Sequence, residues 1–331
     1  MRVGLDEWSI HHLDISAFDK LALVERLGLE GIQFADARHL SPALDHGEIR
    51  EVAEEAKRRN LYIEMGIPGL NILRSTKAMT AGKGELVEGY RVLLKAAAAA
   101  GSSVIRTFAG GPGDRTHGRL QWSLQLHGAT QLAKLLAPLA RELGVSLAFE
   151  THADVTSFEL LRIIEEVGED VAKVCLDTGN FPIVLEDPLA ATRRLAPYVV
   201  ATHMKDCIVF HTDNGLTVQS RPLGTGILPV SDILAILKRS NPAVCLSIED
   251  HEGLFPVDIF TDGWQEHYED LQADELTWLI REARRCEERI RNGEIEDPQR
   301  MELIPWSAQA EDRIRAAGEY MKRKVQEAVT V

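Results

Sequence analysis

The sequence predicts an α/β fold, a (β/α)8 TIM barrel with a C-terminal helical extension. Eight short apolar runs alternate with helical patterns along the chain. The runs are continuously apolar, as expected of parallel strands that are buried on both faces. A length of 331 residues accommodates an extension as well as one barrel, which commonly takes about 250 residues.

The predicted strands are separated by stretches long enough for a helix. An open, doubly wound sheet is the structural alternative, but it usually carries a glycine-rich phosphate loop after its first strand. Here Asp6, Glu7 and Trp8 follow the first strand instead. The predicted strands are Arg2–Leu5, Gly31–Ala35, Leu61–Met65, Val104–Phe108, Val145–Glu150, Ala172–Asp177, Val199–Met204 and Val244–Glu249.

Helical patterns fill the intervals between these strands. The stretch 86–100 is rich in the strong helix formers Ala and Leu, and the stretch 48–59 carries a charged face. Repeated alternation of strand and helix is typical of a barrel with an outer ring of helices. The predicted helices are Phe18–Leu27, Glu48–Arg59, Leu86–Ala100, Gln121–Leu143, Phe158–Val167 and Ser231–Arg239.

A charged helical segment follows the predicted barrel. Ala273–Arg291 and Ala308–Ala328 both have helical patterns, and a loop, Asn292–Pro305, joins them. We therefore divide the chain into a barrel domain, residues 1–271, and a C-terminal helical extension, residues 272–331. The extension either packs on the barrel or forms an arm that binds a partner subunit.

The composition indicates a globular protein that binds neither nucleic acid nor membrane. The formal net charge is −14, so the average field repels a polyanion. The longest apolar runs, such as Leu195–Ala201, are far too short to span a bilayer. The four cysteines form no CxxC pair, and the N-terminus has no signal-peptide pattern. We expect a reduced, cytoplasmic protein.

Four consecutive predicted strands end on, or next to, a side chain that can bind a metal ion. They contribute Glu150, Asp177, His203 and Glu249. The C-terminal ends of neighbouring strands lie side by side at the mouth of a barrel, where barrel enzymes place their active sites. One acid after a strand often only begins a loop, but four ligand types at the same topological position are hard to obtain by chance. Buried carboxylates also repel one another unless a cation lies among them.

The chemistry of these four side chains indicates a divalent metal. Three carboxylates and one imidazole suit Mn²⁺, Mg²⁺ or Co²⁺, and Zn²⁺ also accepts such ligands. We expect Mn²⁺ as the cofactor. The barrel, residues 1–271, is then a metal-dependent catalytic domain.

These motifs resemble the xylose isomerase-like TIM barrel superfamily. The resemblance is to its branch of sugar phosphate isomerases and epimerases, which includes tagatose 3-epimerase, hydroxypyruvate isomerase and inosose dehydratase. The family's Glu, Asp, His and Glu at four successive strand ends match the four candidate ligands. The segment His203-Met204-Lys205-Asp206 resembles its HxKD signature, and residues 221–226 resemble its glycine loop. The resemblance covers residues 1–271, and the extension lies outside it.

The resemblance implies a sugar isomerase or epimerase that abstracts a proton next to a carbonyl through a metal-stabilised enediolate. A cation at the carbonyl oxygen stabilises the enolate, and a nearby carboxylate can take the proton. Glu150 and Glu249 would be both ligands and the acid–base pair, whereas Asp177 and His203 would be ligands only. The expected partner is a small sugar or keto-sugar substrate, and the expected assembly is a homo-oligomer.

Other site residues follow from their positions near the ligands. His152 lies two residues after Glu150, so in an extended segment it points the same way and is a candidate catalytic base. Lys205 and Asp206 belong to the HxKD segment, and Asp206 can order the ligands through hydrogen bonds. Arg221 can hold a substrate hydroxyl or carboxylate. We expect the last three residues to bind substrate.

One position departs from the family pattern. Ketose epimerases of this family often carry a His three residues after the metal-binding Asp, and it contacts substrate. Here that position is Asn180, which can donate a hydrogen bond to a hydroxyl but cannot carry a proton near neutral pH. We expect Asn180 to bind substrate, and its identity favours a substrate or a reaction other than plain ketose 3-epimerisation.

Two other functions stay open. A metal-dependent lyase or dehydratase would eliminate a group from a keto-sugar at the same metal site. It would resemble inosose dehydratase, or a 3-keto C-glycoside deglycosidase that works in a hetero-complex with a small subunit. A non-catalytic sugar-binding barrel is the other alternative.

Overall fold

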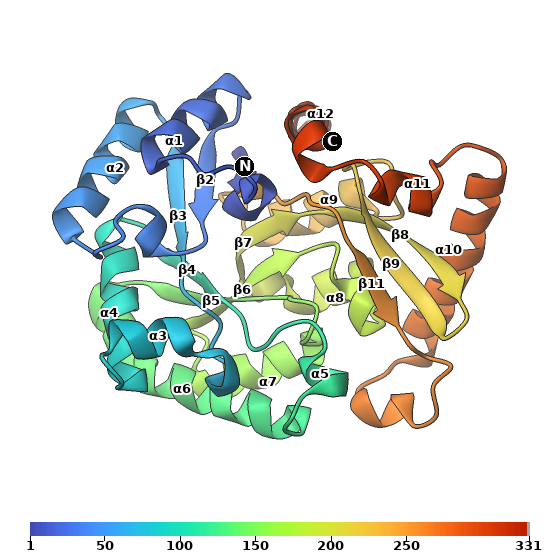
Figure 1. Ribbon diagram of the computed structural model, residues 1–331, viewed down its shortest axis with the longest axis horizontal. Helices are drawn as coiled ribbons and strands as arrows, with labels where there is room; N and C mark the ends of the chain where they lie inside the picture. The colour runs from blue at the N-terminus through green and yellow to red at the C-terminus, as the bar shows by residue number, and fades with distance from the viewer. Residues whose placement is uncertain (330–331) are drawn as a thin grey trace.

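The computed structural model describes residues 1–329 and confirms the predicted fold, a closed barrel of eight parallel strands ringed by helices (Figure 1). Around the barrel the strands follow the order β1, β10, β7, β6, β5, β4, β3 and β2. The barrel strands are β1 (Val3–Asp6), β2 (Gly31–Phe34), β3 (Tyr62–Gly66), β4 (Val104–Thr107), β5 (Ser146–Glu150), β6 (Ala172–Asp177), β7 (Val199–Met204) and β10 (Leu246–Ile248).

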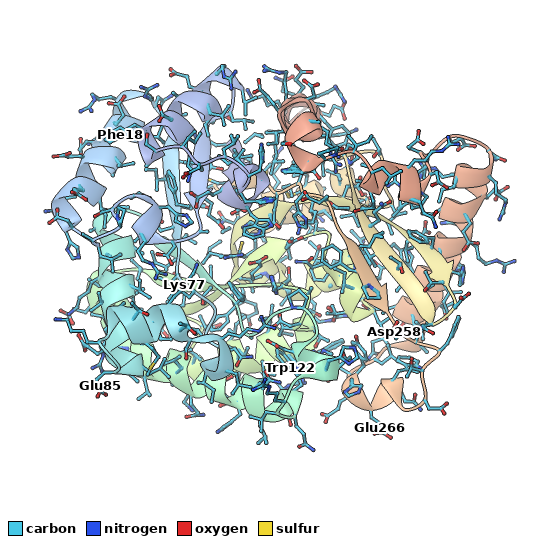
Figure 2. All side chains as sticks on the ribbon, viewed as in Figure 1. Phe18, Lys77, Glu85, Trp122, Asp258 and Glu266 are labelled. Atoms are coloured by element: carbon cyan, nitrogen blue, oxygen red, sulfur yellow. The ribbon has the colours of Figure 1, made fainter. Side chains whose placement is uncertain are left out.

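All eight predicted strands are present, and their bounds differ by at most two residues from those predicted. Apolar side chains fill the space between strands and helices (Figure 2), and strand residues such as Leu5, Ile105 and Leu147 are fully buried. Burial on both faces explains why these strands are continuously apolar in the sequence.

The six predicted helices are also present, as α1 (Ala17–Arg26), α2 (His46–Arg58), α4 (Leu86–Ala99), α6 (Trp122–Leu143), α7 (Ser157–Val167) and α9 (Val230–Ser240). A further helix, α8 (Pro188–Leu195), was not predicted. Its start has a recognisable signal, because the Asp187 side chain accepts hydrogen bonds from two backbone N–H groups and Pro188 takes the first helical position. Two short helices, α3 (Thr76–Ala81) and α5 (Asp114–His117), lie in loops at the barrel mouth.

A second sheet, which the sequence analysis missed, stands beside the barrel. It has the antiparallel order β11 (Leu254–Val257), β9 (Gly215–Arg221) and β8 (Asp206–Thr212). Only Lys205 separates β7 from β8, so the two strands run together in the sequence. The hairpin register pairs Thr212 with Gly215, so Asp213 and Asn214 form its two-residue turn, and both are residue types that favour turns. The predicted glycine loop is therefore shorter than expected, since Arg221 belongs to β9.

The C-terminal helices pack on the rest of the chain. Helix α10 (Ala273–Arg291) lies against β8, and a short helix, α11 (Pro298–Glu302), interrupts the predicted loop. Helix α12 (Trp306–Val329) lies against β1, β10 and α9, which is the position of the eighth helix of a barrel (Figure 1). The division of the chain at residue 271 stays a prediction. No helix within residues 1–329 is long and apolar enough to cross a membrane.

Two buried polar contacts fasten α12 to the barrel. The Trp306 indole donates a hydrogen bond of 2.9 Å to the carbonyl oxygen of Ser9. The Arg313 guanidinium pairs with the Asp250 carboxylate through bonds of 2.8 and 2.5 Å, and both side chains are less than a tenth exposed. Asp250 directly follows Glu249, so the last helix is tied to the strand end that carries a candidate ligand.

Replacing Arg313 with Met should strongly destabilise the protein. The substitution leaves the Asp250 carboxylate buried without its partner, which typically costs about 3–5 kcal/mol. Urea unfolding followed by circular dichroism measures the loss. Arg315→Met on the same helix is the matched control, because the ion pair of Arg315 with Glu311 is exposed and such pairs contribute little. Equal effects of the two substitutions would contradict the structural role of the buried pair.

Candidate active site

The four candidate ligands converge at the C-terminal end of the barrel. Glu150 and Asp177 are the last residues of β5 and β6, while Glu249 directly follows β10. His203 is the penultimate residue of β7. One ligand atom from each side chain lies within 4.8 Å of the others, and all four residues are buried. Their strands are neighbours in the barrel, so the shared position along each strand brings the side chains together.

His203 is oriented with one ring nitrogen toward the acidic ligands. Its Nδ1 atom lies 2.6 Å from Glu249 Oε2 and 3.2 Å from Glu150 Oε1. Its Nε2 atom lies 2.6 Å from the amide oxygen of Gln33, which can only accept a hydrogen bond. The proton of a neutral imidazole therefore resides on Nε2, and the lone pair of Nδ1 faces the carboxylates. A lone pair this close to a carboxylate oxygen requires a proton or a cation between them.

Two basic side chains partly balance the charge of the cluster. Lys205 Nζ lies 2.9 Å from Asp177 Oδ2 and 2.7 Å from Glu249 Oε1, and the Arg106 guanidinium pairs with Glu150. Burial raises the pKa of Asp177 to about 6, although Lys205 opposes this shift. Burial also disfavours ionised Glu249 and Glu150, but their basic neighbours hold both pKa values well below the usual range. Both glutamates are therefore ionised at neutral pH.

The arrangement fits a divalent cation. Glu150 Oε2 and Glu249 Oε2 are buried, and neither accepts a hydrogen bond of good geometry from any described residue. Each of these oxygens lies beside a basic group, Arg106 for Glu150 and His203 for Glu249, but without a well-directed hydrogen bond its burial is costly unless a cation binds it. Three carboxylates and one imidazole are a ligand set that Mn²⁺ and similar ions accept.

A cavity of about 650 Å³ opens above the four ligands, within the usual size of a small-molecule site. We call it the barrel-mouth cavity. Aromatic and polar side chains line it, including Lys77 of α3, which points toward the middle of the molecule (Figure 2). The lining includes Trp8, Lys77, Arg106, Phe108, Glu150, His152, Asn180, Lys205, Glu249 and His251.

His152 lines this cavity, and its ring is held from two sides. The ring stacks on Phe108 with centroids 4.9 Å apart, and its Nδ1 atom lies 2.8 Å from Asp154 Oδ1. Burial lowers the pKa of His152, but the bond to Asp154 and the negative charges of Glu150 and Asp154 together outweigh it, so the net shift is upward. The other ring nitrogen, Nε2, is left for substrate. The catalytic role of His152 stays a prediction.

Asn180 and Lys205 also line the cavity, as expected of residues that bind substrate. The Asn180 amide donates a hydrogen bond of 2.8 Å to Asp177 Oδ2. It therefore orients a candidate ligand in addition to facing the cavity. Contact of Asn180 and Lys205 with substrate stays a prediction.

Asp206 and Arg221 are not among the residues that line the barrel-mouth cavity, and contact of either one with substrate stays a prediction. The Asp206 carboxylate is buried and accepts hydrogen bonds from the backbone N–H groups of residues 207, 224, 226 and 228. It thereby fixes the glycine loop to the end of β7. The Arg221 guanidinium turns toward the C-terminal segment, where it donates to Gln219 Oε1 at 2.6 Å and to the Glu296 carbonyl at 2.9 Å.

The sequence analysis missed polar residues inside the barrel strands that support the ligands. Gln33 of β2 accepts from His203 and donates a bond of 2.9 Å to Glu64 of β3, where burial raises the pKa of Glu64 to about 7. Arg106 of β4 pairs with Glu150 and lies over the Phe108 ring. The available signal was a polar side chain in the middle of an otherwise apolar strand.

A family comparison agrees with this fold and site. The model of the family described as xylose isomerase-like TIM barrel matches residues 21–282. The chain therefore belongs to that family, as its motifs predicted.

Three proteins similar to this chain are compared, and the two of them with a stated activity differ in it. The Escherichia coli K12 protein YihM, which is uncharacterised, is 24% identical over 68% of this chain and 61% of its own length. A 3-oxo-isoapionate decarboxylase of Pectobacterium atrosepticum is 24% identical over 59% of this chain and 62% of its own length. This chain thus spans about three fifths of these curated relatives. The solved D-psicose 3-epimerase of Clostridium cellulolyticum H10 has a TM-score of 0.59 at 17% identity, covering 86% of this chain and 98% of that one.

Replacing Glu249 with Gln should weaken Mn²⁺ binding at least about 100-fold, since loss of a residue that only supports a ligand already costs up to that much. Isothermal titration calorimetry of metal-free protein measures the affinity. Glu165→Gln is the matched control, because Glu165 is an exposed residue of α7 outside the cluster. If both variants bind Mn²⁺ like the wild type, the four residues are not a metal site.

Replacing Gln33 with Leu should lower Mn²⁺ affinity about 10- to 100-fold without removing a ligand. The Leu side chain cannot accept the hydrogen bond from His203 Nε2, so the imidazole loses its fixed tautomer and orientation. The same titration measures the effect, and a thermal melt shows whether the variant folds. Unchanged affinity in a folded variant would rule out this supporting role.

Proposed function

We propose that this protein is a divalent-metal-dependent sugar isomerase or epimerase that moves a proton at a carbon next to a carbonyl. The observation that carries the proposal is the pair of ionised, buried carboxylates, Glu150 and Glu249, on either side of His203. Their strands, β5 and β10, are separated by β6 and β7, so the two groups approach the cavity from different sides. Membership in a family of mostly sugar-modifying enzymes supports a sugar substrate.

The four candidate ligands, Glu150, Asp177, His203 and Glu249, would hold the metal, and Mn²⁺ is the ion we propose. The bound cation supplies positive charge that polarises the substrate carbonyl and makes the neighbouring hydrogen more acidic. Asp177 and His203 would only hold and orient the metal ion. Asn180 donates a hydrogen bond to Asp177, and Gln33 accepts one from His203, which supports a role for both residues in orienting the metal.

Glu150 and Glu249 would move the proton. One carboxylate takes it from the carbon next to the carbonyl, and its low pKa in the free protein means that it starts ionised, as a base must. Return of a proton to the opposite face of the same carbon gives an epimer. Return to the former carbonyl carbon gives the isomer. Lys205 and His152, which also face the cavity, would hold the sugar hydroxyls.

Elimination from a keto-sugar is the second candidate function. Two observations favour it: a decarboxylase is among the relatives, and Asn180 stands where the ketose epimerases that this chain resembles often carry a His. Removal of the same proton leaves a carbanion that can expel a substituent from the next carbon. A small partner subunit stays an expectation for this case, and a homo-oligomer for either case.

Incubation with Mn²⁺ in deuterated water, with a panel of ketoses, inososes and 3-keto-glucosides, tests the proposal by proton NMR. We expect deuterium to enter a carbon next to the carbonyl without loss of a group. Glu150→Gln and Glu249→Gln should each lower the exchange rate at least about 100-fold. Glu165→Gln should leave it unchanged.

Other results of this experiment decide between the remaining functions. Release of water or of another substituent together with exchange identifies a lyase. A protein that binds Mn²⁺ and sugar but exchanges no hydrogen with any member of the panel is a binding protein, and the enzymatic proposal is then wrong.

A further inference from the structure

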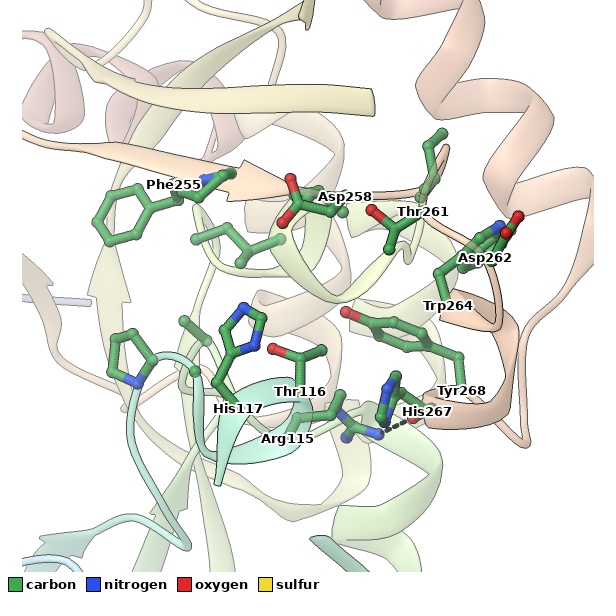
Figure 3. Close-up of a pocket in the computed structure, with 17 residues that line it drawn as sticks. Arg115, Thr116, His117, Phe255, Asp258, Thr261, Asp262, Trp264, His267 and Tyr268 are labelled. Carbon is green, nitrogen blue, oxygen red and sulfur yellow. Dashed lines mark hydrogen bonds between the residues drawn. The ribbon is translucent and has the colours of Figure 1, made fainter. Parts of the chain in front are cut away.

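A second cavity, of about 350 Å³, lies next to the barrel-mouth cavity (Figure 3). We call it the side cavity. Helix α5 forms one wall and β11 with the segment 258–268 forms the other. Figure 3 shows Phe255 at one end and the rings of Trp264 and Tyr268 toward the other end. The proposed proton transfer uses none of these residues.

The two cavities adjoin each other. Pro112, Ala153 and Phe255 line both of them and form their common border. Ala153 directly follows His152, which lines only the barrel-mouth cavity. A molecule held at the four candidate ligands and extended past the border at Ala153 would enter the side cavity.

The side cavity offers aromatic surface together with polar groups that have no protein partner. Within the described residues, no hydrogen bond or ion pair engages the side-chain polar atoms of Thr116, Asp258 or Tyr268. The Tyr268 ring is nevertheless fixed, because the Arg115 guanidinium lies 5.0 Å from its centroid and donates 2.6 Å to the neighbouring His267 carbonyl. In Figure 3 the Tyr268 hydroxyl and Thr116 project into the same space. Flat rings beside free hydrogen-bonding groups suit a hydroxylated ring.

The carboxylates of the side cavity disfavour an anion. Within the described residues, Asp258 and Asp262 have no basic partner. Arg115 is engaged by the Glu159 carboxylate, which leaves the imidazoles of His117 and His267 as the other basic groups of the lining. A phosphate or carboxylate placed here would meet two carboxylates and no free guanidinium. A neutral ring bearing hydroxyl groups meets acceptors for its O–H groups.

We propose that the substrate has two rings, with the keto-sugar at the four candidate ligands and a neutral, hydroxylated ring linked to it in the side cavity. This inference rests on the proposed function, because it assigns the reacting ring to that site. It names the substrate class as glycosides rather than free or phosphorylated monosaccharides.

Calorimetric titration of the Mn²⁺-loaded protein with unreactive sugars tests the inference without requiring catalysis. The probes are glucose, maltose and cellobiose, which present the second ring through an α or a β linkage. We expect one disaccharide to bind at least about tenfold more tightly than glucose. Tyr268→Phe and Asp258→Asn should each reduce the disaccharide affinity about three- to tenfold and leave glucose binding unchanged. Neither substitution removes a contact within the protein.

Asp232→Asn is the matched control, because Asp232 is an exposed carboxylate of α9 away from both cavities, and it should bind all three sugars like the wild type. Equal affinity for one and two rings, or disaccharide binding that both variants retain, would overturn the inference even if the protein exchanges deuterium with free keto-sugars. A preference for two rings that the variants abolish supports the side cavity as the site of the second ring. Absence of deuterium exchange with every substrate would instead contradict the proposed function and leave this binding result standing.

Discussion

Negative charge buried at the barrel mouth is the constraint on which the surrounding structure depends. Asp177, Glu150 and Glu249 lie too close together to remain ionised without nearby positive charge. Lys205 and Arg106 supply part of that charge, and a divalent cation would supply the rest. The adjacent Asp250 receives its own arginine from α12. Each of these buried carboxylates therefore has a basic side chain as its partner.

The segments around the barrel mouth serve this centre in different ways. The hairpin of β8 and β9 is fixed at its start by Asp206, whose carboxylate accepts hydrogen bonds from the backbone N–H of Cys207 and from three N–H groups of the loop after β9. Strand β11 extends the same sheet and forms one wall of the side cavity. The hairpin follows the seventh barrel strand and β11 follows the eighth, and the sheet that they form adds the side cavity beside the barrel-mouth cavity.

The barrel and the convergence of its four candidate ligands were predictable because both follow from local sequence and topology. Parallel strands read as apolar runs, and a ligand at the end of each of four neighbouring strands must converge. Gln33 and Arg106 were missed because a single polar residue barely changes an apolar run. The orientation of Arg221 was also not predictable. A side chain on β9 can face either the barrel mouth or the C-terminal segment. Arg221 faces the C-terminal segment because it donates a hydrogen bond to the Glu296 carbonyl there.

The pairing of Arg313 with Asp250 joins residues 63 positions apart. During synthesis, the strand that bears Glu249 leaves the ribosome well before the helix that holds it in place. A nascent chain can therefore close most of the barrel while the end of its last strand still lacks its anchor. We infer that the candidate metal site is completed late in folding, so an unfinished chain would hold its four candidate ligands without the helix that anchors Glu249's strand end.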